Sequence, residues 1–304
     1  MGFIARIRAN ERFVLLLWAL PFVVFIISFN YVPLAGWALA FFNYKPGIPL
    51  SRTPFIGLHS FIQIFTFYRA QVFNAFRNTV IFTSIGLALS PLPVIFAVFI
   101  NEIRGVRFKK LIQTTTTLPY FISWVIIFSL AFSLFQSTGV VNNVLMQLGI
   151  IKKPTMLLGS PNSVYWFQTA LTWWKGLGWS AIIYIAAIAG IDSELYDAVS
   201  VDGANRWGKM RHITIPGLMP TFVVLFLLSV GNFISAGFDQ YFLFANPMVT
   251  NNIEVLDTFV YRTGITLGQY SFASAVGILK TMISIVLLFT ANWIAKKTRG
   301  QSII

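Results

Sequence analysis

Six long apolar segments restrict what this chain can fold into more than any other feature of the sequence. They cover roughly residues 13 to 41, 72 to 100, 113 to 135, 164 to 190, 219 to 245 and 271 to 295. A helix needs about 20 apolar residues to cross a hydrocarbon layer about 30 Å thick, so each segment is long enough to span a membrane. Only 10% of the 304 residues are charged, well below the usual share in a soluble domain. The sequence therefore predicts a membrane protein with six spans.

The spans are predicted to be helices. Lipid admits only helices or closed barrels, and these continuous apolar runs lack the alternating pattern of barrel strands. Pro21, Pro33, Pro91 and Pro93 fall in the first two spans, where kinks or breaks are expected. No internal repeat or soluble segment of domain size is visible. We expect an all-α integral membrane protein in which residues 1–304 form one domain.

The N-terminal region resembles a cleaved signal peptide only superficially. Arg6, Arg8 and Arg12 precede the first apolar run, and Ala38-Leu39-Ala40 resembles a cleavage site. The apolar character continues as far as Phe42, well beyond the roughly 7 to 15 residues of a signal core. We expect this segment to remain as the first span.

Lys and Arg residues predict the orientation. An even number of spans places both termini on one side, and the side richer in Lys and Arg is the cytoplasmic one. One side would hold Arg6, Arg8, Arg12, Arg104, Arg107, Lys109, Lys110, Arg206, Lys209, Arg211, Lys296, Lys297 and Arg299. The other would hold Lys45, Arg52, Arg69, Arg77, Lys152, Lys153 and Arg262. Both termini are therefore predicted to be cytoplasmic, and the net charge of +13 needs no nucleic-acid partner.

Features of an enzyme or of a metal site are missing from the sequence. The chain has no Cys, and its two His residues, His59 and His212, belong to no ligand pattern. Asp239 is the one carboxylate inside a predicted span. No Gly-x-x-x-x-Gly-Lys phosphate-binding loop occurs, so any ATP would be hydrolysed by another subunit. We expect a non-catalytic chain without a metal or cofactor of its own.

The cytoplasmic loop at about 191–218 is unusually acidic. It starts with Asp192 and Glu194 at the expected N-terminus of a helix, where negative charge complements the helix dipole. A turn is expected at Asp202-Gly203, followed by a second short amphipathic helix from Trp207 to Ile213 that ends before Pro216. Such a pair of helices could dock a soluble partner.

The same loop resembles the EAA motif of binding-protein-dependent ABC importer permeases. Their consensus is Glu-Ala-Ala, three residues, Gly, nine residues, Ile, one residue and Leu-Pro. This chain has Asp197-Ala198-Val199, three residues, Gly203, nine residues, Ile213, Thr214 and Ile215-Pro216. The spacing agrees at every step. Asp for Glu, Val for Ala and Ile for Leu are departures that keep charge or apolarity, although the acid reaches one methylene less far.

The resemblance implies that this loop is a coupling helix seated in a cleft of a cytoplasmic ATPase subunit. Asp197 would pair with a basic group of the ATPase, Ala198 would allow close approach, and Gly203 would make the turn. The implied coupling residues are Asp197, Ala198, Asp202, Gly203, Ala204, Arg206, Ile213 and Pro216. ATP and Mg would be bound by the ATPase.

Further segments extend the resemblance nearly end to end, to LplB-type permeases for polysaccharide fragments such as rhamnogalacturonan and alginate. These segments include Arg77-Asn78-Thr79, Leu118-Pro119-Tyr120, Gly178-Trp179 and Gly268-Gln269-Tyr270. The resemblance implies the type I importer permease fold in a bacterial cytoplasmic (inner) membrane. It also implies a second, different permease, two ATPase subunits, a solute-binding protein and an oligosaccharide substrate. An ion-gradient-driven secondary transporter would also explain six spans with internal charges, but it would not explain the loop spacing.

Polar residues inside the spans mark a candidate substrate path. Lys175, Asp239 and Lys280 are charges that should face the protein interior or water. Asn232, Ser235 and Asp239 recur at helical spacing, which predicts a polar stripe on the path with Asp239 held by one of the two lysines. The alternative is a Lys/Asp pair that only locks helices together.

Aromatic and basic residues leave two interpretations open. Trp173 and Trp174, with Trp179 nearby, could stack on sugar rings along the path or could form an interfacial belt or core packing. Arg52, Arg69, Lys152, Lys153 and Arg262 could attract a uronate-rich cargo, and equally could contact the solute-binding protein or solvent.

Overall fold

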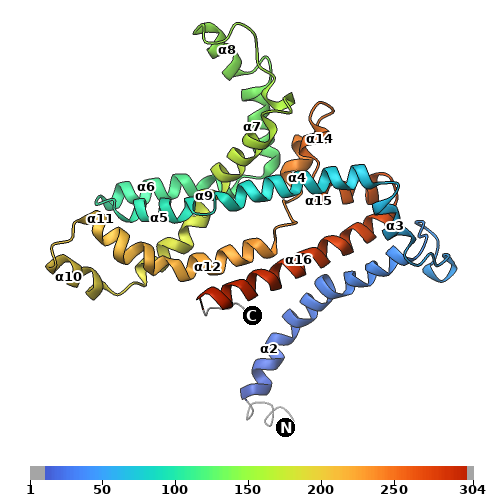
Figure 1. Cartoon of the computed structure of the whole chain (residues 1–304), viewed down its shortest axis with the longest axis horizontal. Helices are drawn as coiled ribbons and strands as arrows, with labels where there is room; N and C mark the ends of the chain where they lie inside the picture. The colour runs from blue at the N-terminus through green and yellow to red at the C-terminus, as the bar shows by residue number, and fades with distance from the viewer. Residues whose placement is uncertain (1–10, 300–304) are drawn as a thin grey trace, which may run out of the picture. The chain divides into compact units, whose positions relative to one another are not determined.

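The computed structural model describes residues 11–299, and helices dominate this range (Figure 1). Within it, the strand-like pairing consists of one isolated antiparallel bridge between Phe42 and Phe55. The predicted all-α fold is therefore confirmed. Arg6 and Arg8 of the predicted basic N-terminus lie outside the described residues.

Two compact units make up the described chain. One comprises the residues up to Tyr68 together with Val260–Leu279, and the other comprises Arg69–Phe259 together with the residues from Lys280. The long helix α16 (Tyr270–Arg299) begins in the first unit and ends in the second. The expectation of a single domain stays a prediction.

The first predicted span is helical but irregular. Helix α2 (Glu11–Ile26) contains Pro21, and a π-helical turn (Ile27–Tyr31) and a 3₁₀ helix (Val32–Phe41) follow it. Proline removes an amide donor and crowds the preceding turn, so the predicted irregularity is confirmed. The most apolar stretch of Val14–Phe41 has no buried residue within this chain, as expected of a helix that faces lipid or another subunit.

The first unit continues with short elements. They are a 3₁₀ turn (Leu50–Arg52), α3 (His59–Phe65), a π-helical turn (Arg262–Thr266) and the beginning of α16. The side-chain hydroxyl of Ser271 joins them, because its Oγ donates to the Phe42 carbonyl (2.6 Å) and accepts from the Tyr44 amide (3.0 Å). The residues after the first span and those before the last span are therefore tied together.

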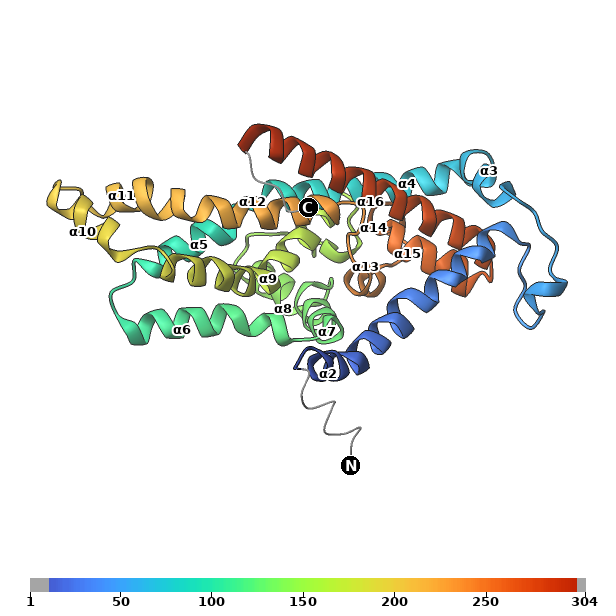
Figure 2. The same cartoon turned by 90° about the horizontal axis from the view of Figure 1, so that it is seen from below.

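The second unit holds the remaining helices, of which α5, α6 and α9 pack side by side (Figure 2). In chain order they are α4 (Arg69–Ala88), α5 (Leu92–Asn101), α6 (Val106–Thr117), α7 (Trp124–Phe135), α8 (Val140–Gln147), α9 (Val164–Ala189), α10 (Ser193–Val201), α11 (Arg206–Lys209), α12 (Ile215–Gly231), α13 (Asp239–Phe244), α14 (Thr250–Ile253) and α15 (Leu256–Tyr261), whose last residues belong to the first unit. Two apolar clusters form its core. One includes Phe82, Tyr241 and Phe244, and the other includes Ala97, Ala181 and Leu218.

Five helical segments are long and apolar enough to cross a membrane, or six if α9 and α10, bent by 69° at their junction, count as one span. The count of six agrees with the prediction, but the third and fifth spans were placed wrongly and lie at Trp124–Gln147 and Arg206–Gly231. The third span begins at Trp124 rather than near residue 113, since Pro119 and the cap residue Ser123 separate α7 from α6. The fifth ends at Gly231 rather than near residue 245.

The motif Arg77-Asn78-Thr79 has a structural role in this unit. Asn78 is fully buried, and its amide nitrogen donates to the carbonyls of Asn251 (2.9 Å) and Glu254 (3.0 Å). Its amide oxygen accepts from the Tyr165 hydroxyl (2.8 Å). A buried amide that satisfies carbonyls from an irregular segment fixes that segment against the helix. Asn78 thus anchors the segment around α14 to α4 and α9.

The break between α6 and α7 is held from α9. The Lys175 ammonium donates to the carbonyls of Tyr120 (2.6 Å), Ile122 (2.6 Å) and Pro119 (3.3 Å), which lie in the 3₁₀ turn Leu118–Phe121 and just after it. One helical turn further along α9, the Trp179 ring stacks on Tyr120 with centroids 4.4 Å apart. Carbonyls freed by a helix break need such donors in a membrane. Lys175 therefore supplies the hydrogen bonds that the carbonyls at this break would otherwise lack.

Close packing of α6 on α9 depends on Gly178. A Cβ atom at this position would collide with the backbone carbonyl of Thr116. At Gly176, two residues earlier, a Cβ atom would meet nothing within 4 Å. Gly178 thus lets the two backbones approach, as small residues do between membrane helices.

We predict that Lys175→Met destabilises the protein by about 2 kcal/mol, because the carbonyls of Tyr120 and Ile122 lose a charged donor. The melting temperature of the detergent-solubilised protein should fall by roughly 4–8 °C. Gly176→Ala is the matched control on the same helix and should leave it unchanged. An unaltered melting temperature in Lys175→Met would contradict the proposed stabilisation of the helix break by Lys175.

Candidate functional site: an exposed helical pair and a cavity

The predicted docking loop forms two short helices at one end of the second unit (Figures 1 and 2). Helix α10 starts with Asp192 as its N-cap, whose carboxylate accepts from the Glu194 amide (2.9 Å). Asn205 caps α11 in the same way, accepting from the Gly208 amide (2.9 Å). The predicted acidic helix N-terminus is confirmed, because a side-chain oxygen here satisfies an otherwise unpaired amide.

A tight turn joins the two helices at Gly203. Its φ of +79° lies in the left-handed region that glycine adopts without strain. The amide of Gly203 donates to the Ser200 carbonyl and that of Ala204 to the Val199 carbonyl, both at 3.1 Å. This pair of bonds is a Schellman motif, the common way to end a helix at glycine. The predicted turn at Asp202-Gly203 is confirmed.

The second helix was predicted to end before Pro216, and this was wrong. A π-helical turn (Met210–Thr214) follows α11 and leads directly into α12, in which Pro216 lies in the first turn. The Ile215 amide donates to the Met210 carbonyl five residues earlier. The wider turn makes room for the proline ring, which would crowd a regular helix. The loop and the span therefore form one continuous helical segment, Arg206–Gly231.

The two faces of this helical pair differ in exposure. The implied coupling residues Asp197, Ala198, Asp202, Gly203, Arg206 and Pro216 are exposed, Ala204 is half-buried, and Ile213 is buried. The Tyr196 hydroxyl lies 3.0 Å from the Thr214 hydroxyl and ties α10 to the segment before α12. Val201 and Trp207 are also exposed, at 89% and 61%. Exposed apolar residues beside exposed charges are typical of a surface that binds a protein.

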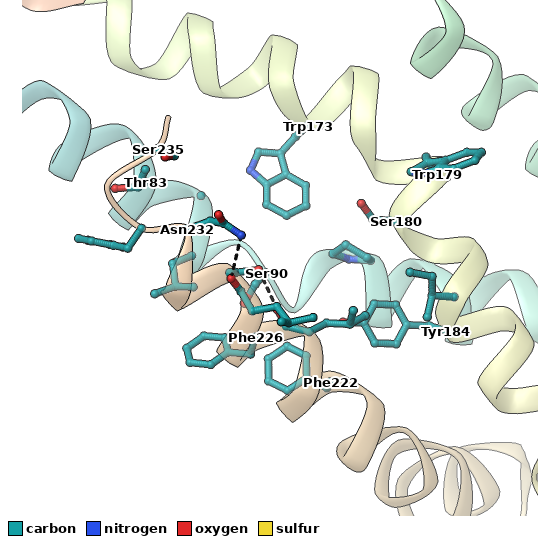
Figure 3. Close-up of a pocket in the computed structure, with 18 residues that line it drawn as sticks. Thr83, Ser90, Trp173, Trp179, Ser180, Tyr184, Phe222, Phe226, Asn232 and Ser235 are labelled. Carbon is teal, nitrogen blue, oxygen red and sulfur yellow. Dashed lines mark hydrogen bonds between the residues drawn. The ribbon is translucent and has the colours of Figure 1, made fainter. Parts of the chain in front are cut away.

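A cavity of about 550 Å³ lies among α4, α5, α9, α12 and the residues after α12 (Figure 3). Its lining mixes aromatic rings with small hydroxyl groups. The polar and aromatic members are Thr83, Ser90, Trp173, Trp179, Ser180, Tyr184, Phe222, Phe226, Ser229, Asn232, Phe233 and Ser235. Trp173 on α9 and Asn232 point toward one another across the space. The cavity can bind a ligand that has both apolar faces and hydroxyl groups.

The predicted polar stripe is interrupted. Helix α12 ends at Gly231, so Asn232 and Ser235 lie in the non-helical residues that follow, where both still line the cavity. Gly237, with φ of +105°, ends this link, and Asp239 begins α13 without lining the cavity. Sequence spacing assumed one straight helix, and the break after Gly231 separates Asp239 from the other two.

The two lysines of the predicted path have other partners than expected. Lys280 forms an ion pair with Asp257 rather than with Asp239. Lys175 binds backbone carbonyls instead of a carboxylate. Among the described residues Asp239 makes no ion pair, so the expected Asp239–lysine pair was wrong. The alternative of a Lys/Asp pair that joins helices fits Lys280, with a different acid.

Of the predicted path residues, the structure brings Trp173, Asn232 and Ser235 together and leaves Trp174 on an exposed part of α9. Sequence reasoning missed Thr83, Ser90, Ser180, Tyr184 and Ser229. Hydroxyl residues are common in membrane helices and often bond to their own backbone, as Ser229 does to the Leu225 carbonyl (2.9 Å). No sequence signal distinguishes the hydroxyl residues that face a cavity from those that bond only to their own helix.

Comparisons with known proteins agree with this architecture. The profile of the family described as "Binding-protein-dependent transport system inner membrane component" matches residues 89–300. The chain is 35% identical to Protein LplB of Bacillus subtilis (strain 168), over 98% of this chain and 92% of the relative. It is 36% identical, with the same coverage, to the polygalacturonan/rhamnogalacturonan transport system permease protein YteP of the same organism.

Solved structures resemble the chain over nearly its whole length. One is a bacterial ABC transporter involved in the import of the acidic polysaccharide alginate; a chain of it matches 98% of this chain with a TM-score of 0.86 and 30% identity. The same alginate transporter in complex with an alginate pentasaccharide-bound periplasmic protein matches equally well. This chain therefore belongs to the binding-protein-dependent transport system inner membrane components and is a permease subunit of an ABC importer.

Proposed function

We propose that this permease imports an oligosaccharide. The observation that carries this proposal is the similarity, over 98% of the chain, to a permease named for polygalacturonan and rhamnogalacturonan and to an alginate importer. The cavity supports it, because Trp173 and the phenylalanines offer faces for sugar rings while Asn232 and the serines offer hydrogen bonds. We therefore propose that the saccharide passes through this cavity and contacts Trp173, Asn232 and Ser235.

An acidic saccharide is the cargo we favour. YteP is named for polygalacturonan and rhamnogalacturonan, and the solved transporter is described as importing the acidic polysaccharide alginate. In this chain Arg52, Arg69, Lys152 and Lys153 are exposed in segments predicted to face away from the cytoplasm. Their charge would raise the local concentration of an anionic oligosaccharide.

The helical pair α10–α11 is the proposed contact for an ATPase subunit. Asp197 is exposed on α10, the turn at Gly203 joins α10 to α11, and Ile213 is buried before α12. A charge-assisted contact at Asp197 would move α10, whose Tyr196 is tied to Thr214 at the start of α12. ATP and Mg would be held by two ATPase subunits, and a second permease would complete the path. This chain would be the non-catalytic subunit of the importer, moved by the ATPase subunits.

We predict cytoplasmic termini, with α10–α11 on the same side. The chain has no Cys, so single cysteines can be introduced without background. Ser193→Cys should react with a membrane-impermeant maleimide only after cells are opened, whereas Ser51→Cys should react in intact spheroplasts. Both positions are exposed in the chain. The reverse pattern would overturn the orientation.

Loss of the Asp197 charge should uncouple transport. We expect Asp197→Asn to lower binding-protein-stimulated ATPase activity of the assembled importer by about tenfold, because a buried partner charge would lose its counterion. Asp197→Glu should retain the activity. Glu194→Gln, which removes an exposed acid from the same helix, is the control and should behave like the wild type. Equal stimulation in Asp197→Asn and Glu194→Gln would reject the contact.

The cargo is tested with the whole importer in liposomes. We expect ATP-dependent uptake of galacturonate or alginate oligomers in preference to neutral oligosaccharides of equal length. Asn232→Leu should reduce uptake by about tenfold without preventing assembly, because a hydrogen-bonding group in the cavity becomes apolar. Trp174→Leu, outside the cavity, should not reduce it. If no saccharide were taken up, the proposed cargo would be refuted. If uptake were unchanged in Asn232→Leu, the proposed path through the cavity would be refuted.

A further inference from the structure

A second hollow, of about 460 Å³, lies within the first unit. Its lining is more polar than that of the cavity among α4, α5, α9 and α12, which we call the membrane cavity. The walls of the hollow come from three segments: the residues after the first span, α3, and the turn that leads into α16. They contribute Asn43, Tyr44, Lys45, Ile56, His59, Ser60, Gln63, Tyr68, Gly268, Gln269, Tyr270, Ser271 and Phe272. A hollow of this size is in the range of small-ligand sites.

Cross-links between these segments give the hollow a defined shape. Ser271 bonds to the backbone at both Phe42 and Tyr44, as described above. The Gln269 amide donates to the Tyr68 hydroxyl (3.0 Å), and the Tyr44 and Tyr270 rings meet edge to face with centroids 5.9 Å apart. Preformed walls lower the entropy lost when a ligand binds.

Several polar groups of the lining keep free hydrogen-bonding capacity. Within residues 11–299, the side chains of Asn43 and Lys45 and the hydroxyls of Tyr44 and Tyr270 make no hydrogen bond to another residue. The Gln269 amide oxygen is buried without a partner. No acidic residue lines the hollow, whereas Lys45 brings a positive charge. The set matches a ligand with hydroxyl groups and a carboxylate, with tyrosine rings for its apolar faces.

We infer that this hollow binds a uronate residue of the saccharide, as a subsite separate from the membrane cavity. The inference rests on the proposed saccharide function and on the proposed orientation. In that orientation both contributing loops face away from the cytoplasm, where a saccharide leaves the solute-binding protein. Lys45 holds the carboxylate, and Tyr44, Tyr270 and Asn43 take the hydroxyls. The small concave volume suits one sugar ring, whereas a specific contact with a protein needs a larger surface.

Direct binding tests the subsite without transport. Trigalacturonate is titrated onto the complete importer in nanodiscs, without binding protein, and saturation-transfer NMR reports the contact. The Asn232→Leu background weakens binding in the membrane cavity. In that background we expect binding to persist and to weaken roughly tenfold with Lys45→Gln, and measurably with Tyr270→Phe, which removes only a hydroxyl. Lys110→Gln removes the same charge from an exposed position outside the hollow and is the matched control.

Each outcome decides the inference. Persistent binding that Lys45→Gln weakens and Lys110→Gln does not supports the subsite. This holds even if liposomes take up no saccharide, in which case only the proposed transport function fails. Binding lost in Asn232→Leu alone, or equal in Lys45→Gln and Lys110→Gln, overturns the subsite. Variants of the hollow that weaken capture of the ligand-free binding protein but not of trigalacturonate also overturn it, in favour of a protein-docking groove.

Discussion

In hydrocarbon every backbone N–H and C=O must find a partner inside the protein, and this requirement shapes the chain wherever its helices break. The break between α6 and α7 is satisfied by the Lys175 ammonium, which reaches three carbonyls from α9. The segment around α14 is satisfied by the buried amide of Asn78. Lys175, which looks like a transport residue in the sequence, and the buried Asn78 thus act as hydrogen-bond donors to backbone carbonyls.

The same breaks create the cavity. Because α12 stops at Gly231, Asn232 and Ser235 leave the helix and lie opposite Trp173. The returning helix α13 is then fixed to α9 by a buried network: the Gln240 amide donates to the Gln168 side-chain oxygen (2.7 Å), and the Thr172 hydroxyl donates to the Gln240 oxygen (2.8 Å). A regular helix through residue 245 would have directed these groups differently. The irregularity therefore places polar groups in an otherwise apolar space.

The exposed pair α10–α11 follows a different rule, because its backbone ends are satisfied by neighbours in the chain. Its ends are closed locally by Asp192, Asn205 and the Gly203 turn, which need no support from the rest of the protein. The π-helical turn Met210–Thr214 carries the helix past Pro216, so α11 and α12 belong to one continuous helical segment.

Local sequence patterns predicted the helical class, the spans and the turn at Gly203 because each depends on neighbours in the chain: apolar length, cap residues and a glycine with positive φ. The family itself could be recognised from the spacing between Asp197 and Pro216, which the exposed pair preserves. The breaks could not be placed at Gly231 or Trp124 because proline and polar residues are tolerated in some membrane helices and end others.

Partners of charged and polar side chains were decided only by tertiary structure. Lys280 selects Asp257 over Asp239, and Lys175 selects carbonyls, because the helix breaks set which groups come within reach. Likewise, Thr83, Ser180 and Ser229 become cavity residues through the packing of α4, α9 and α12. Sequence by itself determined that this chain has membrane-spanning helices and an exposed loop with a turn at Gly203, since hydrophobic length and turn chemistry are local. Which polar residues line the cavity depends on contacts between distant segments, which only the folded chain brings together.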